Sequence, residues 1–283
     1  MWVALALNGV YLAVELAVGL ISDSLALLSD AGHMASDVAA LGLALVAQRL
    51  ARAQAGPAFT FGLRRVPVLG AFGNALSLVI IAVLILWEAW HRLLHPPEVM
   101  AGPVLVAGAI GLVINLVSAW YLHRSAEQSL NIRGAMLHLL ADALGSVGAI
   151  AAAAIILITG WQPVDALVSV LIAVLLIAST WPLLRDSTKV LLQGAPAHLD
   201  LAAVARALEE EDEVLQASDL HVWQIDEGRT VLTGVLATDR SALPELEACA
   251  LRIKHRLHEE YGIRHATLEW CSPGSAGTAC TLS

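Results

Sequence analysis

Six apolar stretches, each long enough to cross a lipid bilayer as a helix, dominate the first two thirds of the chain. A helix needs about 20 consecutive apolar residues to span the hydrocarbon core. Breaks rich in proline and glycine, at 95–98 and 159–163, separate the third from the fourth and the fifth from the sixth, because proline interrupts a helix. We therefore predict an α-helical membrane domain at residues 1–190 with six transmembrane helices, at 2–21, 25–49, 66–91, 103–123, 134–158 and 164–184.

Charge is distributed very unevenly along the chain. Only 14% of the residues are charged, against about 25% in a typical soluble domain. Of the 41 charged residues, 22 lie at 199–283, where 15 acids outnumber 7 bases. No basic stripe is present, which argues against nucleic acid as a partner. The three cysteines, an odd number confined to this tail, do not suggest a disulfide framework.

The acidic tail has the pattern of a small α+β domain at 199–272. Helical spacing at 200–213 and 243–261 alternates with strand-like segments at 216–225, 229–238 and 263–271. A turn at Asp-Glu-Gly (226–228) predicts a hairpin, and Gly262 predicts the end of the second helix. The predicted order is α-β-β-α-β, as in ferredoxin-like and metallochaperone-like domains, and residues 273–283 are predicted to be disordered.

The loops predict which way the protein crosses the membrane. An even number of spans puts both termini on the same side. The loops on that side hold eight Lys or Arg residues, and the opposite loops hold only Arg92. Cytoplasmic loops are enriched in Lys and Arg. Both termini, and the tail, are therefore predicted to be cytoplasmic, with the chain embedded in the plasma or bacterial inner membrane.

Two His-x-x-x-Asp pairs lie within the apolar stretches, His33/Asp37 in the second and His138/Asp142 in the fifth. An ionisable side chain inside a bilayer costs several kcal/mol, so each one is a functional hypothesis. A spacing of four places His and Asp on one face of a helix, about 6 Å apart along its axis. Two such helices side by side would supply four nitrogen and oxygen ligands, the number and type that tetrahedral Zn²⁺ prefers.

The same residues suggest how an ion could move. Histidine binds metal only when neutral, so metal binding releases protons. Because an ordinary imidazole changes its charge near neutral pH, protons could replace the cation as the site turns to the other side. The structural alternative is that each pair holds helices together by polar contacts. Two identical pairs on separate spans favour the metal site.

Other polar residues of the apolar stretches have less specific interpretations. Asp30 could orient a ligand or lie at the aqueous mouth of its span. Glu15, ionisable in the middle of a span, could line a vestibule. Asp165 is interpreted as an acid favoured by the dipole of its own helix. The asparagines could line the same vestibule or join helices: Asn8, Asn74 and Asn115.

Three segments resemble the cation diffusion facilitator family, and in particular its zinc-transporting branch. They are the second-span segment from Ser24 to Asp37, the Phe-Thr-Phe-Gly run at 59–62 and the fifth-span segment from His138 to Ser146. The resemblance covers nearly the whole chain. It implies a homodimer that exports a divalent cation in exchange for protons by alternating access. It also implies that the two tails pack together in the cytoplasm and sense metal, so that Zn²⁺ would be a regulatory ligand as well as the substrate. It implies Zn²⁺ as the main substrate, with Cd²⁺, Co²⁺ or Ni²⁺ as lesser ones, and the four residues named above as the transport site.

Two departures from the family pattern qualify this resemblance. Residues 51–64 contain no His, Cys or acid, so the second metal site that some members carry in this loop is predicted to be absent. A His-rich cytoplasmic segment, common in zinc members, does not occur, and the start of the chain could be truncated.

A metal site in the tail is a separate hypothesis. His221 matches a position that the family uses as a tail ligand, while Val235 replaces its usual partner and Cys271 stands where an acid is usual. His221 and Cys271 could start a zinc site, completed by Cys280 or Glu269. The alternative is that His221 lies at the surface and the cysteines are incidental.

Three other functions stay open at this stage. An intramembrane metalloenzyme would need an open coordination position and a motif such as His-Glu-x-x-His, which the chain lacks. A membrane metal sensor would bind metal without moving it. A passive channel would show neither saturation nor proton dependence. The sequence favours a carrier, not an enzyme.

Overall fold

A computed structural model describes residues 2–52, 55–124, 130–226 and 228–273. Within these ranges, only the backbone is described for some helical residues, namely 2–8, 37, 40, 41, 44, 45, 48, 121–124 and 130–141. The chain forms two compact units. The membrane unit comprises residues 1–45 and 71–184, and the tail unit comprises 46–70 and 185–283. Compared with the boundary predicted at residue 190, the tail unit also takes in the segment between the second and third helices.

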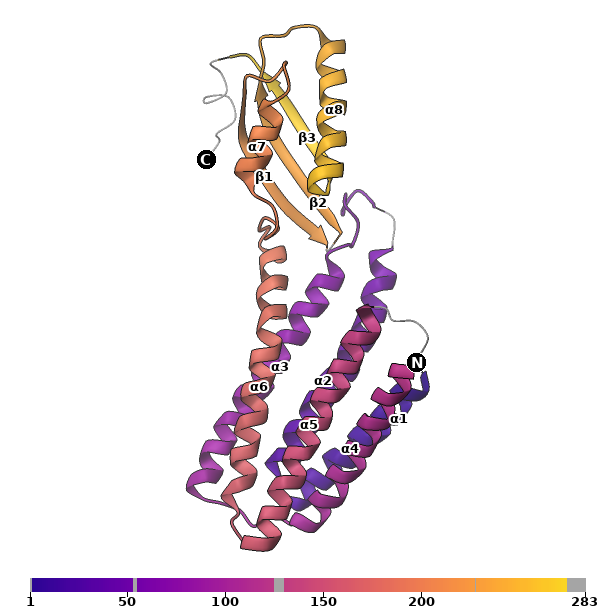
Figure 1. Ribbon diagram of the computed structural model, residues 1–283, viewed down its shortest axis with the longest axis vertical. Coiled ribbons are helices and arrows are strands. Elements are labelled where there is room, and N and C mark those ends of the chain that lie inside the picture. Colours follow the sequence, from indigo (N-terminus) through magenta and orange to yellow (C-terminus); the bar gives the residue numbers. More distant parts are fainter. Residues whose placement is uncertain (1, 53–54, 125–129, 227, 274–283) are drawn as a thin grey trace. The chain divides into compact units, whose positions relative to one another are not determined.

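Six long helices correspond one for one to the six predicted stretches (Figure 1). Four of them have described segments long and apolar enough to cross a membrane, at Val66–Leu94, Ala101–Trp120, Asp142–Thr159 and Pro163–Leu191. The first has a shorter described apolar segment, Gly9–Ser22. The chain is a multi-pass membrane protein. Its helices are α1 (Trp2–Ser22), α2 (Leu25–Ala51), α3 (Val66–Leu94), α4 (Ala101–Arg124), α5 (Leu130–Thr159) and α6 (Pro163–Leu191).

The turn between α5 and α6 shows how the sequence ends these helices. Gly160 adopts a left-handed conformation with a φ of 70°, which glycine reaches without steric cost. Its backbone N–H donates to the Ile156 carbonyl at 2.8 Å and closes the last turn of α5. Pro163 then opens α6, where its missing N–H costs nothing. The predicted break at 159–163 is therefore confirmed.

Small residues line the contacts between the membrane helices, while large apolar side chains face outward. Ala107, Ala152 and Ala153 are buried where α4 meets α5. A Cβ on Gly108 would lie 3.0 Å from the Ile150 side chain, so these helices approach closely. Ile158, by contrast, is 84% exposed. Small interface residues and outward-facing aliphatic side chains are typical of helices packed in lipid.

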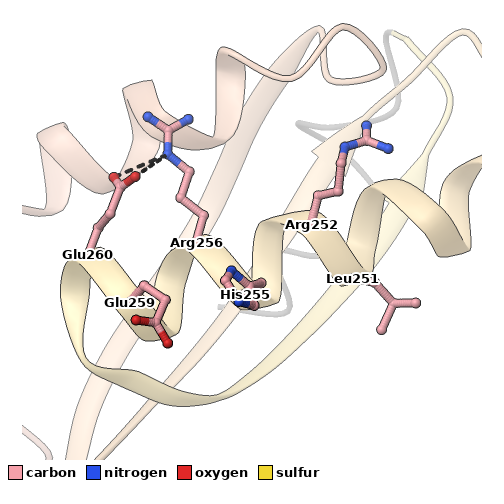
Figure 2. Close-up of a pocket in the computed structure, with 6 residues that line it drawn as sticks. All are labelled: Leu251, Arg252, His255, Arg256, Glu259 and Glu260. Atoms are coloured by element: carbon pink, nitrogen blue, oxygen red, sulfur yellow. Dashed lines mark hydrogen bonds and ion pairs between the residues drawn. The ribbon is translucent and has the colours of Figure 1, made fainter.

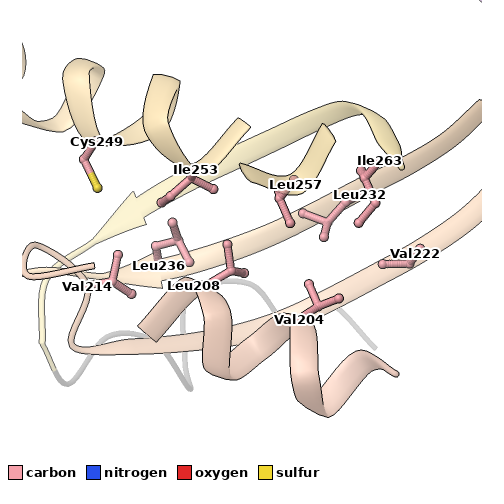
Figure 3. Packing of buried hydrophobic residues seen from close by; sticks show 10 residues of the cluster. All are labelled: Val204, Leu208, Val214, Val222, Leu232, Leu236, Cys249, Ile253, Leu257 and Ile263. Atoms are coloured by element: carbon pink, nitrogen blue, oxygen red, sulfur yellow. The ribbon is translucent and has the colours of Figure 1, made fainter. Parts of the chain in front are cut away.

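The tail folds in the predicted order, as α7 (Leu201–Glu209), β1 (Gln216–Asp226), β2 (Arg229–Ala237), α8 (Leu243–Tyr261) and β3 (Ile263–Cys271). The sheet order is β1-β2-β3, with β1 antiparallel and β3 parallel to β2. Both helices contribute to one apolar core, shown in Figure 3. The first helix ends at Glu209, not at 213 as predicted, because the following residues turn so that Val214 enters this core.

Residues between α2 and α3 contact the tail, which is why they belong to its unit. Phe61 packs edge-on against His265, with ring centroids 5.8 Å apart. The Arg65 guanidinium donates to the Gln224 carbonyl oxygen at 3.4 Å. Arg64 lies 3.9 Å from the Asp226 carboxylate, at the β1–β2 turn.

Candidate metal centre

His33 on α2 and Asp142 on α5 face each other inside the membrane unit. The His33 Nε2 atom lies 3.5 Å from the Asp142 Oδ1 atom. His33 is half-buried and Asp142 is buried. A direct hydrogen bond would be shorter, at about 2.7–3.2 Å. Two ligand atoms that share a tetrahedral Zn²⁺ lie about 3.4 Å apart, given metal–ligand distances of about 2.0–2.1 Å. The observed spacing therefore suits two groups that hold one cation between them.

The other two predicted ligands are one helical turn away on the same helices. Asp37 follows His33 by four residues on α2, and His138 precedes Asp142 by four on α5. The side chains of both lie outside the described part of the structure. The structure thus brings together one ligand from each predicted pair. The complete set of four stays a prediction.

The close approach of α2 and α5 depends on small residues beside the candidate centre. A Cβ on Gly145 would lie 3.3 Å from the Asp30 Oδ1 atom, so a side chain there would press on this buried carboxyl group. On the other side of α2, a Cβ on Gly32 would lie 3.2 Å from Ile81 of α3. The Ser36 hydroxyl donates to the Asn74 side-chain oxygen at 2.9 Å. For Asn74, this supports the role of joining helices.

Two buried polar residues of α1, Tyr11 and Glu15, lie near the candidate metal centre, and the sequence analysis singled out only Glu15. Glu15 is fully buried, and Tyr11 is 3% exposed. The Tyr11 hydroxyl lies 3.1 Å from the Glu15 Oε1 atom and 3.2 Å from the Ala107 carbonyl oxygen of α4. Glu15 also interacts with Asp30 and Asp142. The sequence marked Glu15 as exceptional, but Tyr11 gave no signal because its partner on α4 is 96 residues away.

Asp165 has a partner on another helix in addition to its predicted place at the start of its own helix. Its carboxylate accepts from the Ser24 hydroxyl at 2.6 Å and from the Leu25 backbone N–H at 2.7 Å. It therefore caps the first turn of α2, where backbone N–H groups lack partners within the helix. Asp165 does lie in the first turn of α6, as predicted, and the cap on α2 is a second role that the sequence did not predict. The capping partner was not predictable from local pattern, since it lies 140 residues away.

The tail does not bring His221 and Cys271 together within one chain. His221 pairs with Thr233 across β1 and β2, and Thr233 pairs with Thr267 of β3. Cys271 lies four residues further along β3, a distance of roughly 13 Å in an extended strand. His221 is largely exposed, and its Nε2 atom lies 3.0 Å from Asp219. The predicted pairing of these two ligands is therefore wrong for a single chain, and Cys280 lies outside the described residues.

The fold and the His–carboxylate contact define a class, a helical membrane protein with a candidate cation centre among its helices. Residues 1–192 match the cation efflux transmembrane domain. The zinc transporter ZitB of Escherichia coli (strain K12) is 42% identical over 277 residues, which cover 96% of this chain and 87% of ZitB. The chain therefore belongs to the cation efflux family, the cation diffusion facilitators, as the resemblance predicted.

Two further relatives carry related names. The metal cation efflux system protein CzcD of Cupriavidus metallidurans (strain ATCC 43123 / DSM 2839 / NBRC 102507 / CH34) is 40% identical over 268 residues, 95% of this chain and 84% of CzcD. The cadmium, cobalt and zinc/H(+)-K(+) antiporter of Bacillus velezensis (strain DSM 23117 / BGSC 10A6 / LMG 26770 / FZB42) is 38% identical over 262 residues, 92% of this chain and 83% of that protein.

Proposed function

We propose that this protein is a carrier that exports Zn²⁺ from the cytoplasm in exchange for protons, with Cd²⁺, Co²⁺ or Ni²⁺ as lesser substrates. The observation that carries the proposal is the contact of 3.5 Å between His33 and Asp142, which come from two different helices. The names of the relatives, a zinc transporter and a divalent cation antiporter, agree with it. His33, Asp37, His138 and Asp142 form the transport site.

The chemistry of this set suits a carrier. Two carboxylates balance the charge of a divalent ion, so the loaded site is neutral and can move within a low-dielectric interior at low cost. Two imidazoles favour zinc-like ions over Mg²⁺ or Ca²⁺, which prefer oxygen ligands. When the site opens to the outside, protons that bind the imidazoles and carboxylates compete with the metal and release it. Zn²⁺ is the cargo in this scheme, and the protein performs no covalent chemistry.

The arrangement in the membrane is part of the proposal. All six long helices cross the bilayer, both termini are cytoplasmic, and the protein works as a homodimer in the plasma or inner membrane. The excess of Lys and Arg in the loops on one side supports this orientation. The six apolar helices, found where the sequence predicted them, support the number of spans.

Zinc flux into vesicles tests the function. The purified protein is reconstituted in liposomes with an imposed pH gradient, and Zn²⁺ entry is followed with a trapped fluorescent indicator. We expect saturable, gradient-driven uptake, with at least a 100-fold loss in Asp142→Ala and Asp37→Ala. Glu98→Ala, which removes an exposed acid of the α3–α4 loop, should transport normally.

The alternatives predict different results in the same vesicles. A metal sensor would bind Zn²⁺ without moving it, and a passive channel would move it without saturation or dependence on the gradient. Normal flux in both aspartate variants would refute the site. Flux that ignores the pH gradient would refute proton coupling but not transport.

A further inference from the structure

A second group of metal-ligating side chains lies in the tail. Glu211 and Glu213 come from the turn between α7 and β1, and Cys249 comes from the inner face of α8. Their ligand atoms all lie within 4.8 Å of one another. In a tetrahedral zinc site, with metal–oxygen distances of about 2.1 Å and a metal–sulfur distance of about 2.3 Å, oxygen and sulfur ligands lie about 3.6 Å apart. The group would have to close by about an ångström to hold an ion.

The thiol distinguishes this group from an ordinary surface ion pair. Cys249 is fully buried, and Figure 3 shows it at one end of the tail's core, its thiol directed toward the segment that carries Val214. The buried sulfur adds a soft ligand beside the two carboxylates, which an ordinary surface ion pair lacks.

The chain already places a cation on the two carboxylates. The Arg252 Nε atom donates to the Glu211 Oε2 atom at 3.0 Å, and its Nη2 atom donates to Glu213 at 2.8 Å. This guanidinium therefore contacts both carboxylates, the position that a metal ion would take. The Arg252 side chain is half exposed, which leaves it room to move away.

We propose that Glu211, Glu213 and Cys249 form a second site for a zinc-like divalent cation, and that Arg252 occupies this site until the metal displaces it. A guanidinium can use the two carboxylates but not the sulfur. Zn²⁺ or Cd²⁺ can use all three ligands, with water in the fourth position. This site goes beyond the proposed transport function, since none of its residues belongs to the transport site.

The displaced guanidinium has a surface to occupy. The exposed face of α8 carries an open groove lined by Leu251, Arg252, His255, Arg256, Glu259 and Glu260 (Figure 2). Glu259 and Glu260 give this groove negative charge, although Arg256 already pairs with Glu260 at 3.2 Å. Metal binding would therefore exchange one ion-pair arrangement of α8 for another and tie the α7–β1 turn to α8 through the metal.

Cadmium titration of the full-length protein in detergent tests the site. The starting protein carries Cys271→Ser and Cys280→Ser, which leave Cys249 as the single thiol. Cd²⁺ alone is added, and the ultraviolet charge-transfer absorption of Cd²⁺–thiolate is recorded. We expect this absorption to saturate at the intensity of one Cd²⁺–thiolate bond per chain and to vanish in Cys249→Ser. Glu211→Gln and Glu213→Gln should each weaken Cd²⁺ binding by at least about tenfold.

Arg252→Gln separates a metal site from an ion-pair network. If Arg252 competes with the metal, its removal should tighten Cd²⁺ binding by about tenfold. Arg256→Gln, a matched change one turn further along α8, should leave the affinity unchanged. Thermal unfolding of each variant shows that the tail is folded, and the glutamate and arginine variants decide the outcome if Cys249→Ser does not fold.

Two results would overturn the proposal. One is a folded starting protein that shows no Cd²⁺–thiolate absorption. The other is an Arg252→Gln variant that binds Cd²⁺ as weakly as the glutamate variants, because then the cluster would be an ion-pair network only. Asp142→Ala should keep the absorption, so a failure of the transport proposal and a failure of this site are distinguishable.

Discussion

The membrane unit and the tail differ in where they place their ionisable groups. Among the described residues, the buried ionisable carboxyl groups are Glu15, Asp30, Asp142 and Asp165, and all four belong to the membrane unit. The described core of the tail holds apolar side chains and one cysteine. Its charges lie outside this core, for example Arg256, which pairs with Glu210 at 2.6 Å. The unit with the less polar surroundings thus has the more polar interior.

This difference follows from what each interior has to do. In water, a domain gains stability by burying apolar surface, so the tail needs no buried charge to fold. In lipid, the association of apolar surfaces contributes little stability. A buried carboxyl group there is costly unless it binds an ion, takes part in hydrogen bonds or carries a proton. Each buried carboxyl group of the membrane unit therefore calls for its own explanation, whereas the charged residues of the tail do not.

Truncation of the tail's core should have the largest effect on stability. Leu232 is fully buried, and Leu232→Ala should lower the free energy of unfolding of the tail by about 2–5 kcal/mol. Leu251 is 69% exposed, so Leu251→Ala makes the same chemical change without loss of packing. Hydrogen exchange of the α7 and α8 amides in the full-length protein measures both. Equal protection in the two variants would mean that this core does not hold the tail together.

Loss of the buried cap should have the next largest effect. Asp165→Ala leaves the Ser24 hydroxyl and the Leu25 N–H without their acceptor, at a cost of about 1–3 kcal/mol. Unfolding in mixed micelles of increasing SDS content measures this cost. Asp186→Ala, which removes an exposed acid from the same helix, should be neutral. If the two variants were equally stable, the hydrogen bonds of Asp165 would contribute nothing to the fold.

Glu15 should affect transport more than stability. The single Tyr11 proton has two acceptors, Glu15 and the Ala107 carbonyl. In Glu15→Gln, the amide can donate to the Tyr11 oxygen while Tyr11 donates to Ala107, so the packing is kept. The variant loses a group able to carry charge beside Asp30 and Asp142. We expect unchanged stability and about a tenfold fall in zinc flux, with an altered dependence of flux on pH.

Normal flux in Glu15→Gln, at every pH tested, would mean that Glu15 only joins helices. A loss of stability together with a loss of flux would also mean that Glu15 has a structural role and not a role in transport. Tyr11→Phe serves as the matched control, because it removes the hydroxyl but leaves the carboxyl group in place.

Sequence patterns predicted what depends on neighbours along the chain. Apolar length gave all six long helices of the membrane region, and alternating patterns gave the order of elements in the tail. The contact between His33 and Asp142 was also foreseeable, because a spacing of four fixes the face of a helix and lipid makes each ionisable residue conspicuous.

The features that the sequence analysis predicted wrongly or missed depend on pairing between distant segments of the chain. The register of β1, β2 and β3 separates His221 from Cys271, and no local pattern encodes that register. The same holds for the partner of Asp165 on α2 and for the approach of Cys249 to the α7–β1 turn. In the tail, moreover, acids are common at the surface, so the acids beside Cys249 did not stand out in the sequence as those in the membrane unit did.

The smallest effect is expected at the start of α7, where one acid has two separable roles. The Asp200 side chain accepts from the Ala202 N–H at 3.0 Å and so caps the helix. It also lies 3.9 Å from Arg206, in a pair whose side chains are 69% and 67% exposed. Asp200→Ala should cost about 1 kcal/mol, because it removes the cap. Asp200→Asn keeps an acceptor and loses only the charge, and Arg206→Gln loses only the pair.

Asp200→Asn and Arg206→Gln should each change the free energy of unfolding of the tail by less than about 0.5 kcal/mol. Hydrogen exchange at the first turn of α7 measures this change. A cost in Arg206→Gln as large as that in Asp200→Ala would show that an exposed ion pair contributes to the tail's stability. The contrast with the membrane unit would then be weaker than proposed, because charge outside the tail's core would also hold structure in place. A cost confined to Asp200→Ala would instead assign the role to the hydrogen bond of the cap.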